Sequence, residues 1–239
     1  MKRIFKIFID FDGTITTKDV GDAIFKKFGE PNSVKRIIND LLSDKISAKE
    51  SWLQLCNSVK QISSNELNNF IDTLEIDPTF HQFYNFCEQN NFDYYILSDG
   101  FDYYIERLLK NDGIEHIKYY ANHLTITEDN KLVPSFPYQD EELLTSANCK
   151  RNHIINHSSD DDFTIYIGDG NSDKETAQFC DFIFAKDDLL KFCERERISY
   201  FPYKDFNDVR LRIEKLIAKR NLKKRHQAEL KRREVYMQG

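Results

Sequence analysis

Hydrophobic residues occur along this chain in two spacings, and each spacing predicts a different element. Short, almost continuous apolar runs are typical of buried strands in a parallel sheet, and they cover residues 4–9, 92–97, 118–121, 163–167 and 182–185. Helix-like stretches, such as residues 101–109 and 151–156, lie between them. This alternation predicts an α/β fold with a doubly wound parallel sheet.

One long stretch, residues 17–76, carries helical spacing throughout. Apolar residues recur three and four positions apart from Val20 to Phe28 and again from Val34 to Leu42. Two further helices are expected after capping-box patterns, Ser47-x-x-Glu50 and Ser63-x-x-Glu66. We therefore expect residues 17–76 to form a small helical cap domain inserted after the first strand.

The remaining pattern divides the chain into three parts. Residues 1–16 and 77–215 form the predicted core domain, within which residues 124–133 are typical of a β-hairpin with solvated acids at its turn. Residues 17–76 form the insertion. Residues 216–239 are rich in Lys and Arg and indicate a long, solvated helix or tail.

Composition narrows the class of protein. The 239 residues are 40% hydrophobic and 13% aromatic, which is enough for a substantial core, and no long apolar run or signal-like start appears. Five scattered cysteines without C-x-x-C spacing indicate reduced thiols in the cytoplasm. The formal charge of -6 makes nucleic acid an unlikely partner, and we expect no membrane association.

Two acids at the end of the first strand are the strongest candidate for chemistry. Asp10 and Asp12 follow an apolar run and precede Gly13, so they should lie at the carboxyl end of a strand, where open α/β sheets bind ligands. One acid can then act as a nucleophile while the other donates and accepts protons. The alternative is an ordinary acidic turn that closes a strand.

Three later segments supply complementary groups. Ser98-Asp99-Gly100 follows a second strand and offers a hydroxyl and backbone N–H groups at a helix start, which suits a phosphate. Lys150 precedes a helical stretch and supplies a cation. Asp169, Ser172 and Asp173 follow a third strand and provide oxygen ligands for a hard cation.

Taken together, these segments resemble the four signature motifs of the haloacid dehalogenase superfamily of phosphohydrolases. Asp10 and Asp12 match the first motif, Ser98 the second, Lys150 the third, and Asp169 with Asp173 the fourth. The match spans about residues 4–185. True dehalogenases lack the second acid of the first motif, so Asp12 favours phosphoryl transfer.

The resemblance implies a mechanism with Mg²⁺ as cofactor. Asp10 would attack phosphorus to give an aspartyl-phosphate, and Asp12 would serve as general acid and then base. Mg²⁺ would be held by Asp10, the backbone carbonyl of Asp12, and Asp169. The phosphate would be bound by Ser98, Asp99, Gly100 and Lys150, with Asp173 and Ser172 supporting these groups from behind.

Within the superfamily, the chain resembles the phosphoserine-phosphatase-like branch, and most closely the 2-hydroxy-3-keto-5-methylthiopentenyl-1-phosphate phosphatases of methionine salvage. The stretch from Ser98 to Ile105 carries this likeness. Phosphoserine phosphatases have a glutamate after the first motif and a cap arginine, where this chain offers Asp19 and Gln54, which disfavours phosphoserine. Ser172 stands where that branch tends to have Asn.

Several alternatives remain open. Asp173 could be a charged residue of a first helical turn, and Arg151 or Lys186 could replace Lys150 as the cation. The substrate, a small phosphorylated metabolite, could instead be a phosphocholine, phosphoethanolamine or phosphoserine type of ester. The rival class is a non-catalytic nucleic-acid-binding or scaffolding protein that uses the basic C-terminal residues.

Overall fold

The computed structural model describes residues 4–114, 116–140 and 146–238. They form two compact units that the chain enters more than once. The first unit comprises residues 1–15, 77–97 and 150–239, and the second comprises residues 16–76 and 98–149. The second unit thus contains residues 98–149, which the sequence analysis assigned to the core, beside the predicted helical insertion. A cap role for residues 17–76 stays a prediction.

The first unit is built on parallel strands in the order β2-β1-β5-β6-β7. Their bounds are β1 Phe5–Ile9, β2 Asp93–Phe101, β5 Phe163–Gly168, β6 Phe182–Ala185 and β7 Phe201–Pro202. In register, Ile9 lies opposite Ile96 on one side and Ile167 on the other. Both faces are covered by helices, which is why the strands consist of continuous apolar runs.

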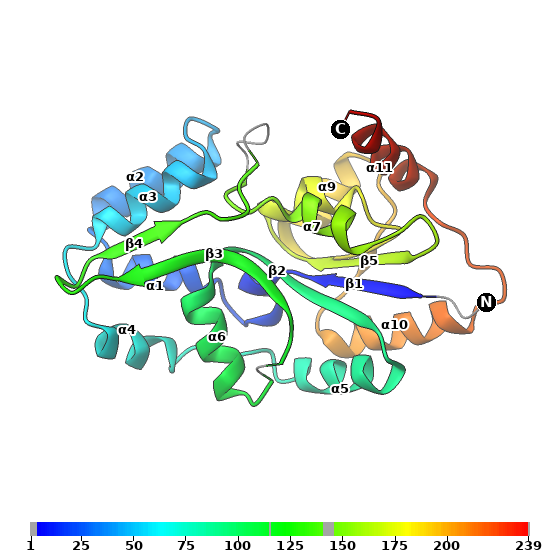
Figure 1. Cartoon of the computed structure of the whole chain (residues 1–239), viewed down its shortest axis with the longest axis horizontal. Helices are drawn as coiled ribbons and strands as arrows, with labels where there is room; N and C mark the ends of the chain where they lie inside the picture. The colour runs from blue at the N-terminus through cyan, green and yellow to red at the C-terminus, as the bar shows by residue number, and fades with distance from the viewer. Residues whose placement is uncertain (1–3, 115, 141–145, 239) are drawn as a thin grey trace. The chain divides into compact units, whose positions relative to one another are not determined.

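Helices flank both faces of this sheet. In Figure 1, α5 and α10 lie on one side of β1 and β5, and α7 and α9 lie on the other. The helices of this unit are α5 Phe80–Asn90, α7 Lys150–His157, α8 Lys174–Ala177, α9 Asp187–Arg195, α10 Phe206–Ala218 and α11 His226–Gln238. The predicted α/β architecture is confirmed, because parallel strands are connected through helices on both faces.

The second unit combines helices with an antiparallel hairpin. Its helices are α1 Val20–Phe28, α2 Pro31–Leu42, α3 Ala48–Ser58, α4 Ser64–Ile71 and α6 Asp102–Asn111. Strands β3 Tyr119–Ile126 and β4 Leu132–Ser135 pair with Ile126 opposite Leu132, as the hairpin prediction required. The run expected as a separate strand at 118–121 is instead the first half of β3.

Local sequence signals explain where the helices of the second unit begin. Ser47 caps α3 in a complete capping box, in which Glu50 N–H donates to Ser47 Oγ at 3.2 Å and Ser47 N–H donates to Glu50 Oε2 at 2.8 Å. Ser63 likewise accepts a hydrogen bond from Glu66 N–H at 3.2 Å. Each side chain satisfies a backbone donor that the helix itself leaves without a partner.

The basic C-terminal residues differ from the solvated helix that their composition suggested. Helix α10 ends at Ala218, and α11 begins only at His226. Arg232 is 2% exposed and Ala228 is fully buried, so α11 packs on the first unit. A run of basic residues is expected to be solvated only where no buried hydrogen-bond acceptor lies within reach. Here buried acceptors lie within reach.

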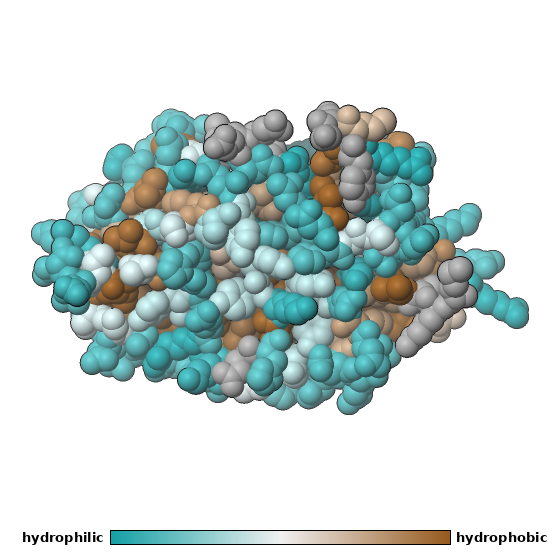
Figure 2. Space-filling view, viewed as in Figure 1, coloured by the Kyte–Doolittle hydropathy of each residue, from teal (hydrophilic) through white to brown (hydrophobic). Residues whose placement is uncertain are grey.

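Apolar side chains are largely withdrawn from the surface. On the face shown in Figure 2, hydrophilic residues predominate and the hydrophobic ones form small, separate patches. The five cysteines form no disulfide with one another, as their scattered positions suggested, and all five are buried. In the part of the chain that the structure describes, no helix combines the length and apolar character needed to cross a membrane.

Candidate active site

The site begins where two neighbouring parallel strands end. Asp10 follows β1 and Asp169 follows β5, and the Asp10 N–H donates to Ile167 O at 2.9 Å, which extends the sheet ladder by one residue. Because parallel strands end at the same edge of a sheet, their first polar residues converge. Asp10 is only 4% exposed.

Lys150 is the cation at the centre of this edge. Its Nζ donates to Asp10 Oδ1 at 2.5 Å, to Asp173 Oδ1 at 2.7 Å and to Ser172 Oγ at 3.1 Å. The side chain is fully buried and starts from the first residue of α7. A buried ammonium is stable only with such partners, so Lys150 is matched to this acidic cluster.

Asp173 is engaged entirely by protein donors. Its Oδ1 accepts hydrogen bonds from Lys150 Nζ at 2.7 Å and Tyr166 Oη at 2.6 Å. Its Oδ2 accepts from the N–H groups of Asp169 and Gly170, each at 3.0 Å. With four hydrogen bonds, this carboxylate orients the turn and the lysine, which fits the supporting role that the sequence analysis expected.

The turn after β1 is held close to Asp169. Thr14 Oγ1 donates to Asp169 Oδ1 at 2.7 Å. Gly13 has a φ of 78°, and a Cβ atom there would lie 2.7 Å from Asp169 Oδ2. Only glycine therefore allows this backbone to approach the carboxylate. Asp12 precedes it with extended backbone angles and is half-buried.

The pKa values of these groups are shifted because several acids are buried around one ammonium. Burial and the nearby Asp173 charge raise the pKa of Asp10 well above its ordinary value, although Lys150 opposes the shift. The same two causes raise the pKa of Asp169 to about 6. Burial alone would lower the pKa of Lys150, but Asp10 and Asp173 raise it, so the lysine stays charged.

The donor set fits a hard divalent cation. Asp10, Asp169 and Asp173 place carboxylate oxygens within 4.8 Å of one another. Oxygen atoms are the ligands that Mg²⁺ prefers, and one ammonium cannot balance three carboxylates. Because Asp173 is already bonded by protein groups, Asp10 and Asp169 are the carboxylates suited to hold the ion. A contribution from the Asp12 carbonyl stays a prediction.

The second unit carries the other predicted phosphate residues. Ser98 is fully buried and its Oγ accepts a hydrogen bond from Gly100 N–H at 2.9 Å. One Asp99 oxygen, Oδ1, accepts three hydrogen bonds at 2.7 to 3.0 Å, from Ser146 Oγ and the N–H groups of Ala147 and Asn148. The Asp99 carboxylate therefore fastens a loop, and only its backbone remains a candidate for phosphate binding.

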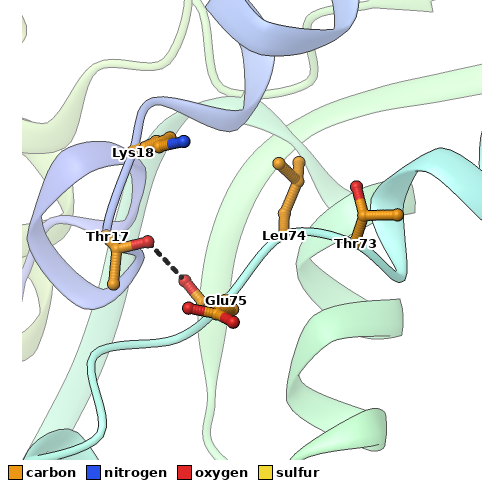
Figure 3. A pocket seen from close by; sticks show the side chains of 5 residues that line it. All are labelled: Thr17, Lys18, Thr73, Leu74 and Glu75. Atoms are coloured by element: carbon orange, nitrogen blue, oxygen red, sulfur yellow. Dashed lines mark hydrogen bonds between the residues drawn. The ribbon is translucent and has the colours of Figure 1, made fainter.

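The two residues predicted to contact substrate from the cap domain, Asp19 and Gln54, belong to the second unit. Asp19 caps α1 by accepting a hydrogen bond from Asp22 N–H at 2.7 Å. Gln54 is half-buried on α3. A pocket of about 180 Å³ in the same unit is lined by Thr17, Lys18, Thr73, Leu74 and Glu75, with Thr17 Oγ1 donating to Glu75 O (Figure 3). Substrate contacts of Asp19 and Gln54 stay predictions.

The sequence of this chain is similar to those of known hydrolases. The profile of the haloacid dehalogenase-like hydrolase family matches residues 7–178. This chain belongs to that family. Proteins of Bacillus cereus (strain AH820) and Bacillus anthracis (strain CDC 684 / NRRL 3495), both named 2-hydroxy-3-keto-5-methylthiopentenyl-1-phosphate phosphatase, are 33% identical to it over 215 residues, covering 89% of this chain and 97% of theirs.

Solved structures of phosphoserine phosphatases share the fold. Phosphoserine phosphatase as a phospho-aspartyl intermediate analogue matches with a TM-score of 0.67 and 16% identity. A substrate-bound phosphoserine phosphatase complex matches with a TM-score of 0.67 and 18% identity. Each covers 89% of this chain and 99% of the other. The family and the α/β fold predicted from the sequence are thereby confirmed.

Other side chains of this hydrolase site escaped sequence reasoning. Tyr166 lies within the apolar run of β5, yet its hydroxyl donates a hydrogen bond to Asp173 Oδ1. Thr14 carried no signal beyond its place in the first motif. In the second unit, Trp52 packs on Phe25 and Phe101 at centroid distances of 5.8 and 4.9 Å.

Proposed function

We propose that this protein is a Mg²⁺-dependent phosphomonoesterase that acts on a small phosphorylated metabolite. The observation that carries the proposal is the buried cluster at the carboxyl ends of β1 and β5, where Lys150 bridges Asp10 and Asp173 beside Asp169. A nucleophilic carboxylate, a fixed cation and oxygen ligands for a metal are the groups that phosphoryl transfer requires.

Each residue of the cluster has a task in this chemistry. When bound, Mg²⁺ would offset the negative charge of the phosphate and of the attacking carboxylate. Asp10 attacks phosphorus, the bond to the ester oxygen breaks, and Asp12 donates its proton to that leaving oxygen. Asp12 then removes a proton from water, which attacks the aspartyl-phosphate and releases orthophosphate as the bond to Asp10 breaks.

Positioning accounts for the role of the other side chains. Lys150, at 2.5 Å from Asp10 Oδ1, fixes the orientation of the nucleophile and favours its ionised form. Asp173 in turn holds Lys150 and the backbone of Asp169. Ser98 would bind the phosphoryl oxygens, as the second motif of the family implies.

We further propose the enol-phosphate of methionine salvage as the first substrate to test. The relatives of that name are 33% identical and are matched over nearly their whole length, whereas the phosphoserine phosphatases share the fold at 16 to 18% identity. A nucleic-acid role is disfavoured, because Arg225 and Arg232 of the basic C-terminal stretch bond protein carbonyls instead of facing solvent.

The test is a screen of phosphate esters with wild type and Asp10→Asn in the presence and absence of Mg²⁺. The panel contains the enol-phosphate, phosphocholine, phosphoethanolamine and phosphoserine. We expect turnover of the enol-phosphate by the wild type alone, and only with Mg²⁺. Equal turnover by Asp10→Asn would contradict the assignment of Asp10 as nucleophile. Preference for another ester would change the proposed substrate but not the proposed mechanism.

A further inference from the structure

The C-terminal segment of the chain bonds the short helix that follows the acidic turn. Helix α8 begins at Lys174, directly after Asp173, and ends at Ala177. The N–H groups of residues 178–180 donate to the last carbonyls of this helix, but a helix of one turn is still marginal without outside partners. The partners come from residues 224–232, which we call the C-terminal arm; its helix, α11, is dark red in Figure 1.

Two arginines of the C-terminal arm donate to carbonyl groups at the end of α8 and just after it. Arg225 Nη2 donates to Ala177 O at 3.0 Å and to Gln178 O at 2.5 Å. Arg232 Nη1 donates to Phe179 O at 2.5 Å. Positive charge at the carboxyl end of a helix is also favourable for the helix dipole.

A buried acid fixes these arginines in turn. Asp181 Oδ2 accepts hydrogen bonds from Thr164 N–H and Oγ1, each at 3.0 Å, which ties it to strand β5. Its Oδ1 lies 3.4 Å from Arg232 Nη2 and 3.3 Å from the Arg225 N–H. Both the Asp181 and Arg232 side chains are almost completely buried, so the pair holds one geometry.

The C-terminal arm and the helix that carries Lys150 both contact Phe179. Lys231 Nζ lies 5.9 Å and Arg151 Cζ lies 6.0 Å from the centroid of the Phe179 ring. Arg151 directly follows Lys150, and its Nη1 lies 3.6 Å from Glu175 Oε1 on α8. The segment after the acidic turn is thus held by α7 and the C-terminal arm together.

We propose that Arg225 and Arg232 are positioning residues for the acidic turn Asp169–Asp173. They hold the far end of α8, and α8 holds Asp173, whose carboxylate orders the Asp169 N–H and the Lys150 ammonium. One helical turn spans about 6 Å, so a displacement of Ala177 should also displace Asp173. Mg²⁺ affinity should therefore depend on the C-terminal arm. This inference rests on the proposed function, which places Mg²⁺ at Asp10 and Asp169.

The experiment compares Arg232→Met with Arg233→Met in the full chain. Arg233 is the next residue on the same helix and is exposed, so it is a matched control. Mg²⁺ binding is measured by calorimetry without substrate, beside the Mg²⁺ concentration that gives half-maximal turnover. We expect Arg232→Met to weaken both by at least about tenfold, as loss of an outer positioning group does at metal sites, and Arg233→Met to leave both unchanged.

Further variants keep the inference testable. Arg232→Lys retains the charge but not the planar fork, and should give an intermediate Mg²⁺ affinity. Arg225→Met tests the same idea if Arg232→Met fails to fold. Unchanged Mg²⁺ affinity in a folded Arg232→Met of lowered thermal stability would overturn the inference. Wild-type protein that binds Mg²⁺ but hydrolyses no ester would overturn only the proposed function.

Discussion

Protonation of one buried histidine should make this protein sensitive to mild acid. His153 lies on α7, one turn after Lys150, and is 6% exposed. Burial, together with the charge of nearby His157, lowers its pKa from 6.5 to about 4. The folded protein therefore keeps this imidazole neutral at pH values where the unfolded chain protonates it.

The sign and size follow from that difference in pKa. Between pH 6.5 and pH 4 the unfolded state binds more protons, so the free energy of unfolding falls as the pH is lowered. At pH 5 the loss relative to pH 8 amounts to about 2 kcal/mol, and below pH 4 it reaches its limit of about 3 kcal/mol. Stability from this group is fully present above pH 6.5.

Urea unfolding at pH 8 and pH 5 measures the effect. His153→Asn removes the titrating group, and His116→Asn, at an exposed position, is the control. We expect wild type and His116→Asn to lose about 2 kcal/mol more than His153→Asn between the two pH values. If His153→Asn loses as much stability as wild type, burial of this imidazole does not control the acid response.

Three further substitutions test the site and the helices. Gly13→Ala should lower kcat at least about 100-fold in a protein that still folds by circular dichroism, because its Cβ would meet Asp169 Oδ2; near-normal turnover would refute the close approach. Asp173→Asn should reduce Mg²⁺ affinity or kcat about 10- to 100-fold, whereas Asp161→Asn, at an exposed position, should change neither. Ser47→Ala should lower the free energy of unfolding by about 1 kcal/mol with no effect on kcat, and unchanged stability would contradict its capping role.

Short-range patterns predicted much of the fold and of the acidic cluster. Strands with continuous apolar runs, and the acids directly after them, follow from local rules, so Asp10 and Asp169 could be placed at one sheet edge. The capping boxes at Ser47 and Ser63 depend on residues three positions apart and were equally readable. These signals lie within one element and need no knowledge of tertiary contacts.

Long-range polar contacts could not be predicted in the same way. Arg232 bonds Phe179 O, 53 positions earlier in the chain, and nothing in its neighbourhood distinguishes it from the exposed Arg233. Asp99 fastens residues 146–148, about 48 positions later. Composition therefore indicated a solvated basic tail, whereas two arginines of this stretch form hydrogen bonds with the buried Asp181.

The reactivity of the buried thiols can report on local unfolding of the protein. Burial raises the pKa of Cys56 and Cys180 to about 12 and that of Cys193 to about 11, and only the thiolate reacts readily with alkylating reagents. Modification by iodoacetamide must therefore await local or global unfolding. Since Cys56 and Cys149 belong to one unit and the other three cysteines to its neighbour, the order of alkylation will show which unit loosens first.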